Sequence, residues 1–228
     1  MKVTRFAPSP TGNLHIGGVR TALFNYVFSK QSGGLFLIRV EDTDRERSKR
    51  EYEEDIISGL EWLGISPDKE PIRQSERSDI YQKAAEKLIN SGNAYWCDCS
   101  PDDLEEMRKQ QVAAGTKPMY DGRSRDLGLE RSDNTVLRLA TPLEGETIVK
   151  DLIRGEITFR NSELDDLILM RSDGTPTYHF CNVIDDFDQG VTTVIRGEDH
   201  ISNTPRQIHI QKALGYPDLE LSLIHISE

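Results

Sequence analysis

Hydrophobic and polar positions first alternate from Val3 to Ala7, and this pattern predicts a short β-strand. Two prolines and a glycine within residues 8–12 predict a stiff turn, and a helix is expected to begin within residues 13–18. The glycines at positions 33 and 34 end that helix. Its predicted apolar face consists of Ile16, Val19, Leu23 and Val27, which recur at helical spacing.

A nearly continuous apolar run from Leu35 to Val40 predicts a second strand that is covered on both faces. Strand, helix and strand in this order form a βαβ unit, which implies parallel pairing and a right-handed crossover. Carboxylates follow the strand directly, within residues 41–44. They are therefore expected at the carboxyl edge of the sheet, where open α/β sheets bind ligands. Two amphipathic helices, over residues 51–63 and 75–91, are expected to cover the sheet.

Near residue 94 the alternation of strands and helices gives way to short irregular pieces, which indicates an inserted domain. Its expected strands lie at residues 136–139, 157–159 and 167–170, and a turn at 172–174 leads into an extended segment, Thr175–Phe180. The alternation returns with the β-branched run Val191–Arg196 and a helix that ends at Gly215.

The sequence therefore predicts an α/β fold, in which a parallel-sheet, nucleotide-binding domain is interrupted by an α+β domain. We expect the first half of the parallel-sheet domain at residues 1–94, the inserted domain at 95–184, and the start of the second half at 185–228.

Composition agrees with a globular protein, since 36% of the 228 residues are hydrophobic and 29% are charged. No apolar run is long enough to cross a bilayer, and Met1 leads directly into the first strand rather than into a signal peptide. We therefore expect a cytoplasmic protein with no membrane partner. The three cysteines, Cys97, Cys99 and Cys181, form no disulfide framework, which leaves reduced thiols or a metal pair.

The turn before the first helix has the features of an anion site. Gly12, Gly17 and Gly18 let a ligand approach the backbone without meeting a Cβ atom. The start of the helix adds unpaired N–H groups and a partial positive charge. From the residues alone, this stretch predicts a nucleotide or phosphate site.

The same stretch carries a resemblance to a known family. Ala7-Pro8-Ser9-Pro10-Thr11-Gly12, followed by His15-Ile16-Gly17-Gly18, resembles the first signature of bacterial glutamyl-tRNA synthetases, which belong to class I. Residues 41–44 and 197–204 are also similar to that family. The resemblance implies a Rossmann-like catalytic domain and an inserted domain that binds the tRNA acceptor end. It further implies a glutamate–tRNA ligase that activates L-glutamate with ATP and transfers it to the 3′ end of tRNA(Glu) in translation.

The resemblance also implies a role for individual residues. His15 and Gly17 would be catalytic, with His15 donating to the developing phosphate charge. ATP, with Mg²⁺, would contact Pro8, Thr11, Gly12, His15, Gly17 and Gly18. L-Glutamate would contact Arg5, Ala7, Ser9, Glu41, Tyr178, Asn182 and Arg196. An arginine suits this ligand because its planar guanidinium pairs with a carboxylate through two bonds, and Glu41 is a natural partner for the substrate ammonium.

Two features of the sequence bear on whether the protein binds tRNA and zinc. The formal net charge is −11, although basic residues cluster at 45–50 and at 123–131, where they form either solvated faces or phosphate contacts. Some members of the family bind zinc through a Cys-x-Cys pair and two later ligands. Cys97 and Cys99 fit the pair, but Ser124 and Asp126 occupy the later positions, so we expect no metal bound to the protein's own side chains there. The expected oligomeric state is a monomer.

Two other functions stay open at this point. One is the shorter paralogue that glutamylates a queuosine base in tRNA(Asp), and the other is a non-catalytic ATP- or tRNA-binding fragment. The family continues toward a Lys-x-Ser-Lys loop and an anticodon-binding domain, which this sequence lacks. We therefore expect a truncated catalytic half with impaired adenylate formation, in which residues 219–228 lie outside the family pattern.

Overall fold

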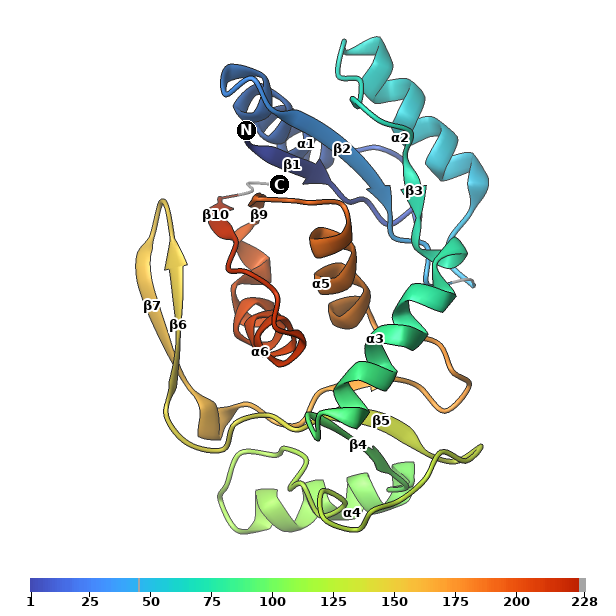
Figure 1. Cartoon of the computed structure of the whole chain (residues 1–228), viewed down its shortest axis with the longest axis vertical. Coiled ribbons are helices and arrows are strands. Elements are labelled where there is room, and N and C mark those ends of the chain that lie inside the picture. The colour runs from blue at the N-terminus through green and yellow to red at the C-terminus, as the bar shows by residue number, and fades with distance from the viewer. Residues whose placement is uncertain (45, 226–228) are drawn as a thin grey trace.

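The computed structural model describes residues 1–44 and 46–225, and Figure 1 shows how the elements are arranged. In chain order they are β1 (Val3–Phe6), α1 (Ile16–Gln31), β2 (Leu35–Val40), α2 (Arg50–Trp62), β3 (Ile72–Arg73), α3 (Ser78–Asn90), β4 (Ala94–Cys97), α4 (Pro101–Ala113), β5 (Val136–Leu139), β6 (Glu146–Asp151), β7 (Gly155–Arg160), β8 (Ile168–Met170), α5 (Tyr178–Asp188), β9 (Thr193–Gly197), α6 (Thr204–Leu214) and β10 (Glu220–Ile224). Short 3₁₀ turns lie at Gln74–Glu76, Asn161–Glu163 and Glu198–Asn203.

Strands β1, β2 and β3 form a parallel sheet, in which Val3 lies opposite Leu35. β9 enters beside β1, where the backbone N–H of Thr192 donates to the carbonyl of Val3 at 2.9 Å. β10 pairs in parallel with β9, and Figure 1 shows both close to β1. The expected α/β fold with a parallel sheet is confirmed.

Helix α1 covers this sheet with a different face from the predicted one. Ile16, Leu23 and Val27 are exposed, whereas the buried positions are Gly17, Ala22, Asn25 and Ser29. Asn25 donates from Nδ2 to the carbonyl of Ile195 in β9 at 2.9 Å. The predicted apolar face of α1 is therefore wrong. Small and polar side chains face the sheet because they allow the helix backbone to approach it closely.

A separate antiparallel sheet of order β4-β5-β8 forms from the middle of the chain, with α4 packed against it. A capping box begins α4: the Ser100 hydroxyl accepts from the Asp103 N–H, and the Asp103 carboxylate accepts from the Ser100 N–H. β6 and β7 form a hairpin that reaches back toward β10, where Asp151 lies opposite Leu221. The sequence pattern predicted β7 but missed β6.

Helix α5 contradicts the expectation of an extended segment over residues 175–180. The chain becomes helical at Tyr178 and stays helical to Asp188. Phe180 and Ile184 are buried in the main core, where helices α3, α5 and α6 meet the β4-β5-β8 sheet. The expected domain boundary at residue 184 falls inside α5, and the division into domains stays a prediction.

The last described residues also join a sheet, because Glu220–Ile224 forms β10. The helix before it, α6, ends at Gly215 in the left-handed conformation, with φ of 71°. The placement of residues 219–228 outside the family pattern stays a prediction, and residues 226–228 lie outside the described part of the chain. None of the helices in residues 1–44 and 46–225 combines the length and the apolarity that a bilayer crossing requires.

Candidate functional site

A pocket of about 260 Å³ opens at the carboxyl ends of β1, β2 and β9. The predicted site residues that line it are Arg5, Ala7, His15, Gly17, Gly18, Glu41, Tyr178, Asn182 and Arg196. The remaining four, Pro8, Ser9, Thr11 and Gly12, belong to the turn that leads into α1 and are not among its lining residues in the described part of the chain. Pro8 instead faces a small apolar hollow beside Ile38 and Ile56.

The topology explains why residues so distant in sequence meet here. Ala7 follows β1 and Glu41 follows β2, while Gly197 ends β9, and parallel strands end at the same edge of a sheet. Tyr178 and Asn182 are four residues apart in α5, so they lie on one face of that helix. The pocket is therefore built from both halves of the parallel sheet and from a helix that the sequence pattern did not reveal.

Arg196 in β9 is a buried cation that forms no ion pair with the described residues. Its side chain donates from Nη2 to the Thr204 hydroxyl at 2.9 Å, and its buried Nε has no hydrogen-bond partner. No carboxylate lies within 4.0 Å of it in residues 1–44 and 46–225. Burial lowers the pKa of Arg196, and Arg5 lowers it further, while Tyr178 acts in the opposite direction. The pocket therefore presents a guanidinium that makes no direct ion pair with any of the described residues, although Asp186 and Glu41 lie near enough to favour its charged form.

Two further charges of opposite sign face the pocket beside Arg196. Arg5 in β1 is buried and donates from Nε to Asp186 Oδ1 at 2.9 Å. Glu41 accepts at Oε1 from Asn182 Nδ2 at 3.0 Å. Burial raises the pKa of Glu41, although Arg39 and Arg5 oppose the shift. The site therefore brings the guanidinium groups of Arg5 and Arg196 close to the Glu41 carboxylate, and Asp199 adds a second carboxylate to the lining.

The turn between β1 and α1 is fastened to the chain after β2. The carbonyl of Pro8 accepts from the Glu41 N–H, and that of Pro10 accepts from the Lys49 N–H, each at 2.9 Å. His15 is the N-cap of α1, yet its side chain makes no capping bond. The first-turn N–H groups of α1 therefore have no side-chain acceptor at the N-cap, and two residues of that turn, Gly17 and Gly18, line the pocket. This arrangement suits a phosphate group.

Several lining residues were not predicted from the sequence: Phe6, Thr21, Ile195, Gly197, Asp199 and His200. Asp199 and His200 lie two and three residues after the end of β9, much as Glu41 follows β2, so their place after a buried strand was an available signal. The ring of His200 lies 6.2 Å from that of Tyr178. Burial lowers the pKa of His200, with a further contribution from Arg196.

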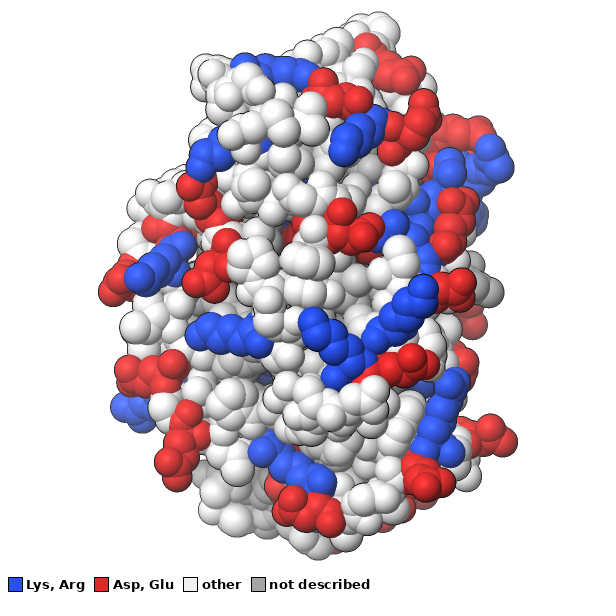
Figure 2. Space-filling view, viewed as in Figure 1, with Lys and Arg blue, Asp and Glu red and all other residues white. Residues whose placement is uncertain are grey.

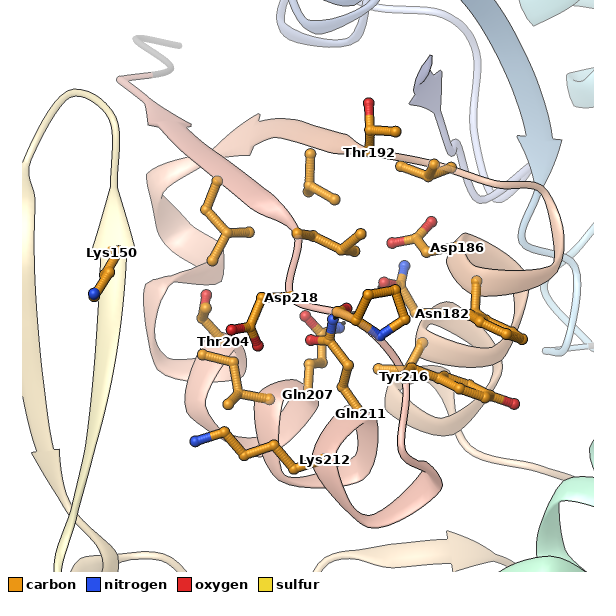
Figure 3. Close-up of a pocket in the computed structure, with 18 of the residues that line it drawn as sticks. Lys150, Asn182, Asp186, Thr192, Thr204, Gln207, Gln211, Lys212, Tyr216 and Asp218 are labelled. Atoms are coloured by element: carbon orange, nitrogen blue, oxygen red, sulfur yellow. Dashed lines mark hydrogen bonds between the residues drawn. The ribbon is translucent and has the colours of Figure 1, made fainter. Parts of the chain in front are cut away.

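A larger cavity of about 590 Å³ lies between α5, α6, β9 and the β6–β7 hairpin. Figure 3 shows Asp186 on α5 and Lys212 on α6 among its labelled residues, with Lys150 on the hairpin. It shares Asn182 and Arg196 with the smaller pocket. The other predicted lining residues gather around the smaller pocket, which is therefore the candidate site.

The cysteine pair occupies a hydrogen-bonded position in the β4-β5-β8 region. Cys97 is fully buried and donates to the Tyr120 hydroxyl at 3.3 Å, and Cys99 Sγ lies 3.8 Å from Ser124 Oγ. Within residues 1–44 and 46–225, no group of three or more His, Cys, Asp or Glu side chains could hold a metal ion. That zinc does not bind stays a prediction.

The two basic clusters are largely paired with acids. Arg47 pairs with Asp44 and Arg50 with Glu54, while Arg125 pairs with the buried Asp166. Arg45 lies outside the described residues. On the face in Figure 2, basic and acidic side chains are interspersed. A contact between these clusters and tRNA stays a prediction.

Comparison with known proteins agrees with this geometry. A glutamate–tRNA ligase of Thermodesulfovibrio yellowstonii is 54% identical over 211 residues, which are 92% of this chain and 45% of that protein. One from Nitrosospira multiformis is 56% identical over 216 residues, 94% of this chain and 46% of that protein. The chain thus spans about half the length of the curated relatives it matches.

A solved structure of a glutamate tRNA ligase has a similar fold. The crystal structure of a glutamate tRNA ligase from Elizabethkingia meningosepticum, in complex with its amino acid, matches with a TM-score of 0.89 and 37% identity. The match covers 98% of this chain and 49% of that one. The family described as tRNA synthetases class I (E and Q), catalytic domain, matches residues 2–226. The chain therefore belongs to the class I tRNA synthetase family for glutamate and glutamine, and corresponds to its catalytic domain.

Proposed function

We propose that the pocket of about 260 Å³ binds L-glutamate and that the chain is the catalytic part of a glutamate–tRNA ligase. The observation that carries this proposal is Arg196, a buried guanidinium with no carboxylate partner among the described residues. Burying such a charge is costly unless an anion pairs with it. A substrate carboxylate supplies that anion.

The other charges of the pocket match the rest of the amino acid. L-Glutamate carries two carboxylates and one ammonium group, and the pocket offers Arg196, Arg5 and Glu41. Arg196 takes the side-chain carboxylate and Arg5 lies beside the reacting one, while Glu41 accepts from the ammonium. Neutral glutamine would leave the charge of Arg196 uncompensated, which favours glutamate.

The start of α1 provides the second half of the proposed chemistry. In amino-acid activation, a carboxylate oxygen bonds to the α-phosphorus of ATP and pyrophosphate leaves. Positioning and charge stabilisation account for most of the catalysis in phosphoryl-level transfer. The N–H groups at Gly17 and Gly18 and the imidazole of His15 are placed to donate to phosphate oxygens. Mg²⁺ would then be held mainly by the phosphates, as is usual for this ion.

We propose tRNA(Glu) as the second substrate, because the matched relatives are glutamate–tRNA ligases. The domain around β4, β5 and β8 would hold its acceptor end. We further propose a cytoplasmic protein that acts as a monomer.

Calorimetric titration of the chain with L-glutamate, L-glutamine and ATP tests the proposal. L-Glutamate and ATP are expected to bind. L-Glutamine is expected to bind at least about 30-fold more weakly than L-glutamate, the lower end of the cost of leaving a buried charge unpaired. Equal affinity for the two amino acids would contradict the role given to Arg196.

A further inference from the structure

Two charged residues lie behind the candidate pocket and contact the charges that face it. Arg39 in β2 is fully buried, and Asp186 in α5 is 3% exposed. In the described part of the chain neither is among the residues that line the pocket of about 260 Å³. Both were absent from the sites predicted from sequence.

Asp186 and Arg39 connect Arg5 to Glu41 through a continuous chain of ion pairs. Asp186 Oδ1 accepts from Arg5 Nε at 2.9 Å and from Arg39 Nη1 at 2.6 Å. Arg39 then donates to Glu41 Oε1, from Nη2 at 3.1 Å and from Nε at 3.4 Å. Asn182 Nδ2 donates to the same oxygen at 3.0 Å.

These hydrogen bonds involve only part of the Arg5 guanidinium and only one oxygen of the Glu41 carboxylate. Arg5 is held through Nε, and its two Nη groups make no hydrogen bond within residues 1–44 and 46–225. Glu41 is held through Oε1, and its Oε2 makes none in the same part of the chain. Because both residues line the pocket, the free edges are available to a ligand. The chain of ion pairs thus orients one donor edge and one acceptor oxygen.

We propose that Asp186 and Arg39 are positioning residues for the amino-acid substrate, which fix the Arg5 guanidinium and the Glu41 carboxylate in the orientation that receives it. This inference rests on the proposed function. It adds to that function two residues that act without touching the substrate.

The electrostatics of the cluster support this assignment. Burial raises the pKa of Asp186, but attraction to Arg39 and Arg5 outweighs burial and the net shift is downward. Glu41 is faced by Arg39 from β2, by Arg5 from β1, by Arg196 from β9, and by Tyr178, Cys181 and Asn182 from α5. Its pKa remains raised even so.

The two positioning residues must therefore act on Glu41 in opposite directions. Without its charge, Asp186 no longer competes for Arg39, and the pKa of Glu41 falls. Without the Arg39 cation, the pKa of Glu41 rises further. Glutamate affinity is expected to fall at low pH, where Glu41 takes up a proton. The part of the pH profile over which the affinity falls is called the acid limb, and its position reports on both changes in the pKa of Glu41.

The main variant is Asp186→Asn, which keeps the size of the side chain, and the matched control is Asp188→Asn. Asp188 lies in the same helix, and its carboxylate is 49% exposed and pairs with Arg77. Calorimetry with L-glutamate and ATP is run on the whole chain between pH 5 and pH 8. In Asp186→Asn the dissociation constant for glutamate is expected to rise about 10- to 100-fold, while that for ATP changes less than about threefold. Asp188→Asn is expected to bind both ligands as the wild type does.

The pH dependence separates positioning from a loss of structure. Relative to wild type, the acid limb of glutamate binding is expected to move to lower pH in Asp186→Asn and to higher pH in Arg39→Gln. If Arg39→Gln does not fold, the shift of the acid limb in Asp186→Asn still tests the inference. Three results for Asp186→Asn would each overturn the inference: glutamate affinity equal to that of the wild type, an acid limb at the wild-type pH, or equal losses of glutamate and ATP binding. Absence of glutamate binding in the wild type would instead overturn the proposed function, and the inference with it.

Discussion

Replacing Arg196 with methionine is expected to weaken glutamate binding and to stabilise the ligand-free protein. Arg196 is 6% exposed and has no carboxylate partner among the described residues. The buried charge therefore lowers the free energy of unfolding of the ligand-free protein, and a bound substrate carboxylate would compensate for it. Methionine fills a similar volume without a charge. One substitution should thus move affinity and stability in opposite directions.

The two magnitudes follow from the burial of the guanidinium. Losing one partner of a buried charged pair costs about 2–5 kcal/mol of binding, which is about 30- to 4000-fold in the dissociation constant. Replacing buried charged groups with apolar ones commonly stabilises a protein by about 1–4 kcal/mol. For a chain of this size, each kcal/mol raises Tm by about 2–4 °C.

Calorimetry and thermal unfolding of Arg196→Met measure both effects. Arg160→Met, which removes an exposed arginine at the end of β7, is the matched control and should leave glutamate affinity unchanged. ATP affinity should stay within about threefold of wild type in both variants. A lower Tm in Arg196→Met, or equal losses of glutamate and ATP binding, would show that Arg196 is not an uncompensated charge that receives the substrate carboxylate.

Three further predictions concern stability and metal content. Burial, with Lys212 and Arg206 nearby, lowers the pKa of His209 from 6.5 to about 4, so the unfolded state binds more protons between these values. The free energy of unfolding should therefore fall as pH drops from 6.5 to 4, and chemical denaturation should show a shallower fall, by up to about 1.4 kcal/mol per pH unit, in His209→Gln. A Cβ atom at Gly34 would lie 1.8 Å from the carbonyl oxygen of Lys2. Gly34→Ala should thus lower the free energy of unfolding by about 1–3 kcal/mol, whereas Gly12→Ala, which meets nothing within 4 Å, should not. Metal analysis of the purified protein should show no zinc, and one equivalent that disappears in Cys97→Ser would contradict this prediction.

The sequence predicted those parts of the fold that have strong local signals. Prolines and glycines mark the turn between β1 and α1, and a continuous apolar run marks β2. Helix α1 was predicted, but its buried face was not, because Ile16, Leu23 and Val27 satisfy the helical spacing while facing solvent. Periodicity identifies an apolar stripe and cannot show that small side chains on another face pack closer to the sheet.

The beginning of α5 was missed because the turn at 172–174 favours a hairpin and therefore an extended continuation. Tertiary packing decides the outcome, since Phe180 enters the core when the chain is helical. The ion pairs behind the pocket have no local signal at all, because Arg39 and Asp186 are 147 residues apart. Only the fold brings them together.

A crystal structure of this chain with bound L-glutamate tests most directly whether Arg196 receives the side-chain carboxylate of the substrate. The side-chain carboxylate is expected about 3 Å from the Arg196 guanidinium, with the ammonium group on Glu41. A glutamate bound in the same pocket with Arg196 still unpaired, or bound only in the larger cavity beside α6, would contradict this role of Arg196.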